Sequence, residues 1–124
     1  MPRGGKIQII KYAPPPPELP IYGRLKPEEA VFIGRTNYVA ALEEKRFIFG
    51  FKRVDRRRHL YIIGKSGVGK SKLLELMLRQ DIAYGYGLCL MDPHGDVVEE
   101  MLHFIPENRI EDVVVIDPSD FNHP

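Results

Sequence analysis

Eight consecutive residues of this sequence have the types and spacing needed to bind a phosphate group. They read Gly64-Lys65-Ser66-Gly67-Val68-Gly69-Lys70-Ser71 and match the pattern G-x-x-x-x-G-K-[ST]. The glycines allow a tight turn that gathers backbone N–H groups on one concave surface. Lys70 would place its charge on the β- and γ-phosphates, and the Ser71 hydroxyl would ligate a bridging metal ion. The pattern predicts a nucleotide-binding site, and Lys72, which follows it directly, is also predicted to bind the nucleotide.

The segments on either side of this loop favour that interpretation. The apolar run His59–Ile63 predicts a buried parallel strand, and residues 70–84 predict a helix with leucines and methionines over most of its circumference. A phosphate-binding loop must lie between a strand and a helix. The alternative is a glycine-rich turn that merely contains a lysine and a serine.

The remaining elements extend the same alternation of strands and helices. Gly87–Asp92 and Val113–Asp117 predict two further buried strands. Between them, Asp96 and Glu99 resemble a capping box at the start of a helix that ends before Pro106. The order predicts a parallel, right-handed α/β unit.

Two carboxylates follow predicted strands on the side where α/β sheets bind ligands. Asp117 ends an apolar run and could orient Mg²⁺, so it is the second candidate catalytic and metal-binding residue beside Lys70 and Ser71. Pro118 stands where a hydrolase of this kind usually has a catalytic glutamate. Asp92 and His94 could line the nucleotide pocket or a subunit boundary; the alternative is turn chemistry at the end of a strand.

The chain preceding residue 59 has a different character. Residues 1–20 predict a flexible, proline-rich segment, and residues 21–58 a small β-rich segment with strands at Val31–Ile33 and Phe47–Phe51. The phenylalanines of the second strand could stack on nucleic-acid bases, but packing within a β-layer is the favoured interpretation. Residues 59–124 form the predicted nucleotide-binding domain.

Charge is divided unevenly along the 124 residues. Residues 1–72 hold 16 Lys/Arg and 6 Asp/Glu, whereas residues 73–124 hold 2 and 11, although the whole chain has a net charge of only +1. The densest basic cluster, Lys52–Arg58, is open to three interpretations: surface charge, a subunit contact or contact with a DNA backbone. The single cysteine, Cys89, and the lack of a long apolar stretch predict a cytoplasmic protein.

Three stretches together resemble a known superfamily. His59–Ser71, Met91–Asp96 and Ile116–Pro118 are similar to the HerA/FtsK superfamily of DNA-pumping ATPases. The likeness is greatest for the coupling proteins of conjugation and type IV secretion, where a similar Asp-Pro-His-Gly turn follows the second strand. The resemblance covers about residues 46–121.

The resemblance implies a fold, an activity and partners. The fold would be a parallel-sheet P-loop NTPase core of the RecA/FtsK type, here incomplete and preceded by the small β-rich segment. The activity would be hydrolysis of ATP, with Mg²⁺, to translocate DNA through a homo-oligomeric, usually hexameric ring. Partners in a secretion or membrane complex could hold it at the inner face of the membrane. The second acidic motif, the sensor and the arginine finger would lie further along a longer motor subunit.

Two other classes of function remain open. One is a different P-loop enzyme, such as a nucleotide kinase; the lack of an N-K-x-D motif disfavours a GTPase. The other is a non-catalytic nucleotide-binding or docking module, which the missing glutamate after Asp117 favours. Multiple-turnover hydrolysis of ATP would separate this module from an enzyme.

Overall fold

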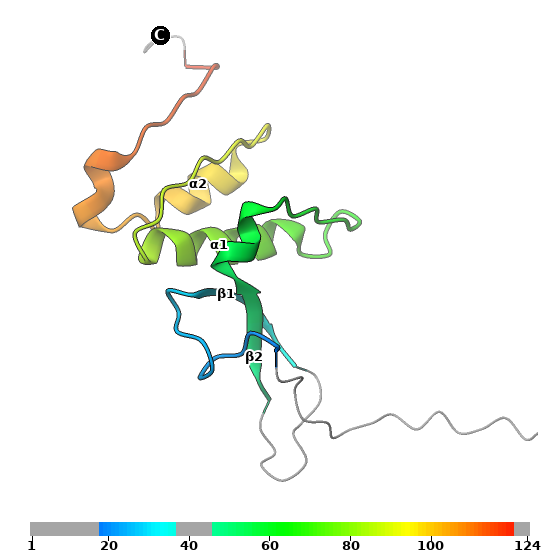
Figure 1. Ribbon diagram of the computed structural model, residues 1–124. Coiled ribbons are helices and arrows are strands. Elements are labelled where there is room, and N and C mark those ends of the chain that lie inside the picture. The colour runs from blue at the N-terminus through cyan, green and yellow to red at the C-terminus, as the bar shows by residue number, and fades with distance from the viewer. Residues whose placement is uncertain (1–17, 37–45, 121–124) are drawn as a thin grey trace, which may run out of the picture. The chain divides into compact units, whose positions relative to one another are not determined.

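Two strands, two α-helices and two 3₁₀-helices make up the regular structure of the described part of the chain, which comprises residues 18–36 and 46–120 of the computed structural model (Figure 1). The elements are β1 (Ala30–Arg35), β2 (Ile48–Lys52), η1 (Arg53–Arg57), α1 (Lys70–Ala83), α2 (Asp96–Leu102) and η2 (Glu107–Asp112). The chain divides into two units between Met77 and Leu78. The predicted proline-rich segment lies outside the described residues up to Pro17.

β1 and β2 form an antiparallel pair in the first unit. Ala30 lies opposite Lys52 at one end of the ladder, and Arg35 lies opposite Ile48 at the other. The register shifts between Phe32 and Gly34, which marks a β-bulge in β1. Both strands predicted before residue 59 are confirmed, with boundaries that differ by a few residues.

A short extended segment covers the other edge of β2. Tyr22 N–H donates to the Ile48 carbonyl and Gly50 N–H to the Pro20 carbonyl, both at 2.9 Å. β2 therefore has hydrogen-bonded neighbours on both sides. Three buried apolar side chains belong to this small sheet and the segment beside it: Ile21, Ala30 and Val31.

Aromatic side chains fill the space around this small sheet. The half-buried Phe49 ring lies 3.4 Å from the position that a Cβ on Gly34 would take. The rings of Tyr22 and Phe32 meet edge to face, with centroids 5.6 Å apart and planes at 70°. These contacts are those of a packed β-layer.

α1 agrees with the helix predicted over residues 70–84. Gly85 follows it with a φ of +77°, a left-handed conformation that glycine adopts without strain. Gly85 N–H donates to the Ile82 carbonyl at 3.1 Å, and Tyr86 N–H to the Asp81 carbonyl at 2.9 Å. These bonds satisfy carbonyls that the last turn leaves without helical partners.

The three predicted parallel strands do not form a ladder among the described residues. His59–Ile63, Gly87–Asp92 and Val113–Asp117 are not strands, and the α/β character comes from an antiparallel pair and separate helices. Parallel strands are stable only when neighbours complete their ladders and helices cover both faces. Without that cover, Ile63 is 79% and Ile116 85% exposed.

α2 is shorter than the helix predicted from Asp96 to the residue before Pro106. It ends at Leu102, and the next two N–H donors, those of His103 and Phe104, bond three residues back at 3.3 and 3.0 Å. A proline disfavours helical geometry in the residue before it, which explains the early end. None of the helices in the described residues is long and apolar enough to cross a membrane.

Candidate nucleotide-binding site

The predicted phosphate-binding loop immediately precedes α1 in the first unit. Gly67 and Gly69 have φ angles of +79° and +103°, where any residue with a Cβ would be strained. Between them, Val68 N–H approaches the Lys65 carbonyl at 3.4 Å. The glycines that the pattern demands at these two positions are therefore required by the shape of the backbone.

Gly64 is required for a different reason, which is that its backbone lies close to the side chains of Val68 and Lys70. A Cβ at this position would lie 2.8 Å from Val68 Cγ2 and 3.3 Å from Lys70 Cγ. The space beside Gly64 is thus filled by the stem of the lysine. Any larger residue would displace Lys70 from its place.

The Lys70 ammonium group folds back over the loop. It donates hydrogen bonds to the Gly64 carbonyl and, at 2.8 Å, to the Lys65 carbonyl. These bonds hold a positive charge over the turn. Lys65 takes part in them through its backbone carbonyl and not through its side chain. Phosphate oxygens are stronger acceptors for an ammonium group than neutral carbonyls, so an arriving anion can replace these bonds.

The first turn of α1 supplies further donors. Its first bond to the loop runs from Leu73 N–H to the Gly69 carbonyl at 2.9 Å. The N–H groups of Lys70, Ser71 and Lys72 have no helical carbonyl behind them, because a helix leaves its first donors unsatisfied. Together with the helix dipole, they favour an anion at this end of α1.

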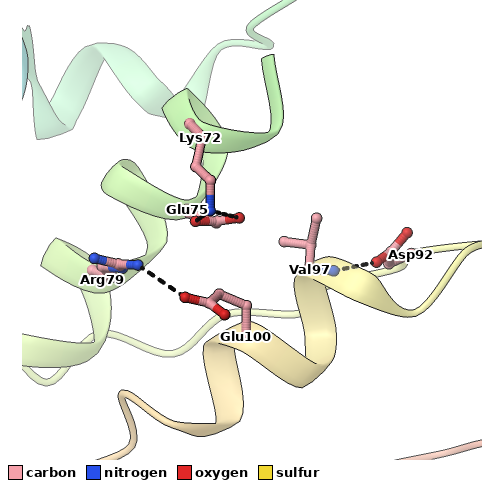
Figure 2. Close-up of polar contacts among 6 residues, drawn as sticks. All are labelled: Lys72, Glu75, Arg79, Asp92, Val97 and Glu100. Atoms are coloured by element: carbon pink, nitrogen blue, oxygen red, sulfur yellow. Dashed lines mark hydrogen bonds and ion pairs between the residues drawn. The ribbon is translucent and has the colours of Figure 1, made fainter. Parts of the chain in front are cut away.

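Lys72 has its side chain engaged elsewhere. Its Nζ contacts Glu75 Oε2 at 2.9 Å, and the Glu75 side chain is only 6% exposed (Figure 2). The charge of this buried carboxylate is thus compensated by a lysine one turn away. Any part that Lys72 takes in phosphate binding is expected to come from its backbone N–H. Ser71 is exposed, and its role as a metal ligand stays a prediction.

Asp92 organises the turn before α2 in the second unit. Its Oδ1 accepts a hydrogen bond from His94 N–H at 3.1 Å, and its Oδ2 accepts one from Val97 N–H at 2.8 Å (Figure 2). These backbone donors hold the pKa of Asp92 below its ordinary value. The His94 side chain is exposed. The turn-forming interpretation of Asp92 therefore accounts for both of its carboxylate oxygens.

The predicted capping box of Asp96 and Glu99 is wrong. Gly95, with a φ of +84°, is the N-cap residue, and no side-chain bond is made from that position. Asp96 is then the first helical residue, one position too late for a box. The Asp92 carboxylate caps the helix instead, by accepting a hydrogen bond from Val97 N–H across the turn.

We expect Asp92→Asn to make unfolding less dependent on pH. A pKa lowered by folding contributes stability above the ordinary value, and this is lost as pH falls through the folded value. The wild type should therefore lose stability below about pH 4, and the variant should lose less. Urea unfolding followed by circular dichroism at several pH values measures this. Equal pH dependence in both proteins would contradict it.

Asp117 is the last residue of the predicted third strand and directly precedes a turn at residues 118–119, also in the second unit. Its Oδ1 accepts hydrogen bonds from the Ser119 hydroxyl at 2.7 Å and from Ser119 N–H at 2.8 Å. Both lower the pKa of Asp117, so the exposed carboxylate is ionised at neutral pH. The phosphate-binding loop belongs to the first unit, and a metal site shared by Ser71 and Asp117 stays a prediction.

An arginine and an aromatic ring join α1 to the end of α2 within the second unit. The Arg79 guanidinium lies 3.5 Å from the centroid of the Phe104 ring. It also lies 3.5 Å from Glu100 Oε1 (Figure 2). Both charged side chains are substantially exposed, so the ion pair itself adds little. The contact with the ring links α1 to the segment that follows α2.

Arg109 is a structural residue that the sequence did not reveal. From η2 it donates to the Ile82 carbonyl at 3.0 Å and to the Tyr86 carbonyl at 3.2 Å, and it lies 3.7 Å from Asp112. These carbonyls belong to the end of α1 and the loop after it. One guanidinium group therefore fixes the path of the chain after α1. The separation of 27 residues from Ile82 hides this contact from any local pattern.

Removing that contact should destabilise the second unit. We expect Arg109→Ala to lower the free energy of unfolding by about 2 kcal/mol, because two carbonyls lose a charged donor. Urea unfolding followed by circular dichroism measures the change. Arg109→Lys keeps the charge but not the planar fork, and it should recover less than half of the loss. An unchanged midpoint in Arg109→Ala would contradict the role given to this side chain.

Two of the predicted strands face one hollow in the second unit. The hollow has a volume of about 940 Å³, and its walls include Leu88, Leu90, Val113 and Val115, with Met101 of α2. These segments thus bring their apolar side chains to one region although they are not paired as strands.

A comparison with known protein families gives a match. A family model described as "Helicase HerA, central domain" matches residues 53–123, which is more than half of the chain. The matched region contains the phosphate-binding loop, the turn at Asp92 and Asp117. No curated protein and no solved structure matches the chain.

Proposed function

Because the chain belongs to the family of the helicase HerA central domain, we propose that it is a subunit of an ATP-driven motor that moves DNA. The family supports a P-loop ATPase in general. The narrower proposals are a coupling protein of conjugation or type IV secretion, a ring of six copies, and DNA as the polymer that is moved. They rest on the resemblance of the Asp-Pro-His-Gly turn and of Ile116–Pro118.

One observation carries the proposal: the Lys70 ammonium held over a glycine loop at the start of α1. Glycines with positive φ shape this loop, and the donors of the first helical turn lie beside it. The loop residues from Lys65 to Gly69 are exposed and contain no carboxylate. Such a site fits a polyphosphate better than a neutral or cationic ligand.

The residues of the loop would then divide the work of binding. The backbone N–H groups and Lys70 would hold and orient the phosphates, and the Ser71 hydroxyl would hold a magnesium ion. Bound MgATP would supply the phosphoanhydride bond whose hydrolysis drives movement. Asp117, ionised at neutral pH, is proposed as the second group that orients the metal.

The parallel core and the domain boundaries also belong to the proposal. His59–Ile63, Gly87–Asp92 and Val113–Asp117 would become neighbouring strands of one sheet when the ladder partners and the covering helices are present. The apolar side chains that line the hollow of the second unit support this for the latter two segments. Boundaries near residues 20 and 58 would separate the proline-rich, β-rich and nucleotide-binding parts.

The experiment that tests this function is an ATPase assay with and without DNA. We expect MgATP hydrolysis that rises on addition of double-stranded DNA and is lost in Lys70→Ala. Hydrolysis that ignores DNA would contradict a DNA motor and favour another P-loop enzyme. Tight MgATP binding without turnover would favour a non-catalytic docking module, which Pro118 in place of a glutamate already makes the second candidate.

A further inference from the structure

Two short 3₁₀-helices of this chain expose matched faces of opposite charge. Residues three apart in a 3₁₀-helix lie one above the other. In η1, Val54 and Arg57 therefore share one side, and in η2 Glu107 and Ile110 do so. Val54 is 65% and Ile110 58% exposed. We call these pairs the η1 face and the η2 face; each is an aliphatic side chain beside a charge.

The charges of the two faces are available to a partner. Arg57 and Glu107 are exposed, and neither makes an ion pair within the described residues. Next to the η1 face, Lys52 and Arg58 are exposed and positively charged, and Asp55 is the one acidic residue among them. Next to the η2 face, Glu111 is exposed and negatively charged. The same contrast runs through the whole chain, since the basic residues concentrate before residue 73 and the acidic ones after it.

The aliphatic centre of each face indicates what kind of partner fits. A nucleic-acid backbone would pair with Arg57 but would leave Val54 in water. A protein surface with an acidic and an aliphatic side chain at the same spacing would satisfy both, as apolar centres with charged rims do in protein interfaces. The η2 face of this chain is such a surface.

We propose that the η1 face of one copy docks on the η2 face of a second copy. Arg57 would meet Glu107, and Val54 would meet Ile110. Because two different faces meet, the contact is head to tail and can repeat from copy to copy until a ring closes. The expectation that copies associate rests on the proposed function, and the two faces are the surfaces through which they would do so. Two small charged faces should give weak, salt-sensitive association.

Charge reversal in separate copies tests the proposal. Sedimentation of the full chain without nucleotide, at about 50 mM and about 500 mM salt, should show association that weakens as salt rises. Arg57→Glu and Glu107→Arg should each weaken it by about tenfold or more, because like charges then face each other. An equal mixture of the two variants should associate again, since each restores the partner of the other. Arg35→Glu, an equal charge change at an exposed site in β1, should have little effect.

Several outcomes would overturn the proposal. These are no association of the wild type, no recovery in the mixture, or an equal effect of Arg35→Glu. Loss of binding to a short DNA duplex in Arg57→Glu, with association unchanged, would assign the η1 face to nucleic acid. An altered unfolding midpoint in the reversals with no change in mass would place the contact within one chain. MgATP binding is measured separately, so its failure would count against the proposed function and not against these faces.

Discussion

Replacing Lys70 by alanine should weaken MgATP binding by about 100-fold, the cost of losing a charged donor to the phosphates. The side chain bonds only to the carbonyls of Gly64 and Lys65 within the described structure, and these lie in an exposed loop. Water can replace the ammonium group there, so α1 and the β-layer should remain folded. Titration of a fluorescent ATP analogue measures binding, and circular dichroism checks the fold.

Lys65→Ala is the matched control for this prediction. It removes the same charge from the same exposed loop, but the role expected of Lys65 is that of its carbonyl and backbone. Its effect on affinity should therefore be small. Equal losses in the two variants would mean that the loop attracts phosphate by general charge and that Lys70 has no special position.

Gly50→Ala should abolish the packing of β1 against β2. Gly50 is buried in the middle of β2, and a Cβ on it would come within 2.7 Å of Phe32 Cα and would also overlap the Val31 carbonyl. Backbone atoms of a paired strand cannot move aside as a flexible side chain can. We expect a loss of at least about 3 kcal/mol, the upper range for overpacking, measured by thermal and urea unfolding.

Gly87→Ala provides the comparison, because nothing lies within 4 Å of the Cβ that it would add. This variant should unfold at or slightly above the wild-type midpoint, since alanine has less conformational freedom in the unfolded chain. A Gly50→Ala protein as stable as Gly87→Ala would show that the two strands can separate at Gly50 without cost. The close approach of Val31 would then not hold the layer together.

Local patterns predicted the local parts of this molecule well. The run from Gly64 to Ser71 carries its own turn and helix start, and α1 begins at Lys70, as the spacing indicates. β1 and β2 were predictable as strands because each is a short apolar run, but their antiparallel pairing was not predicted. Each of these depends on neighbours in the sequence or on one partner strand.

Parts that depend on distant partners were not predictable in the same way. The spacing of Asp96 and Glu99 predicted a capping box, but Gly95 turns left-handed and Asp92 caps the helix from outside it. Arg109 reaches carbonyls that no local pattern connects to it. The apolar run Val113–Asp117 is typical of a strand. A parallel strand, however, needs a paired neighbour and cover on both faces of its sheet, and no described residue pairs with this run.

The β-bulge in β1 has a consequence for solubility. β1 has a ladder partner on one side within the described residues, so its other edge offers backbone donors and acceptors to any passing chain. The shift of register between Phe32 and Gly34 breaks the regular spacing of these groups, and Arg35 places a charge at the end of the strand. A second strand could match only part of this edge. The bulge thus guards the small sheet against growing into an aggregate.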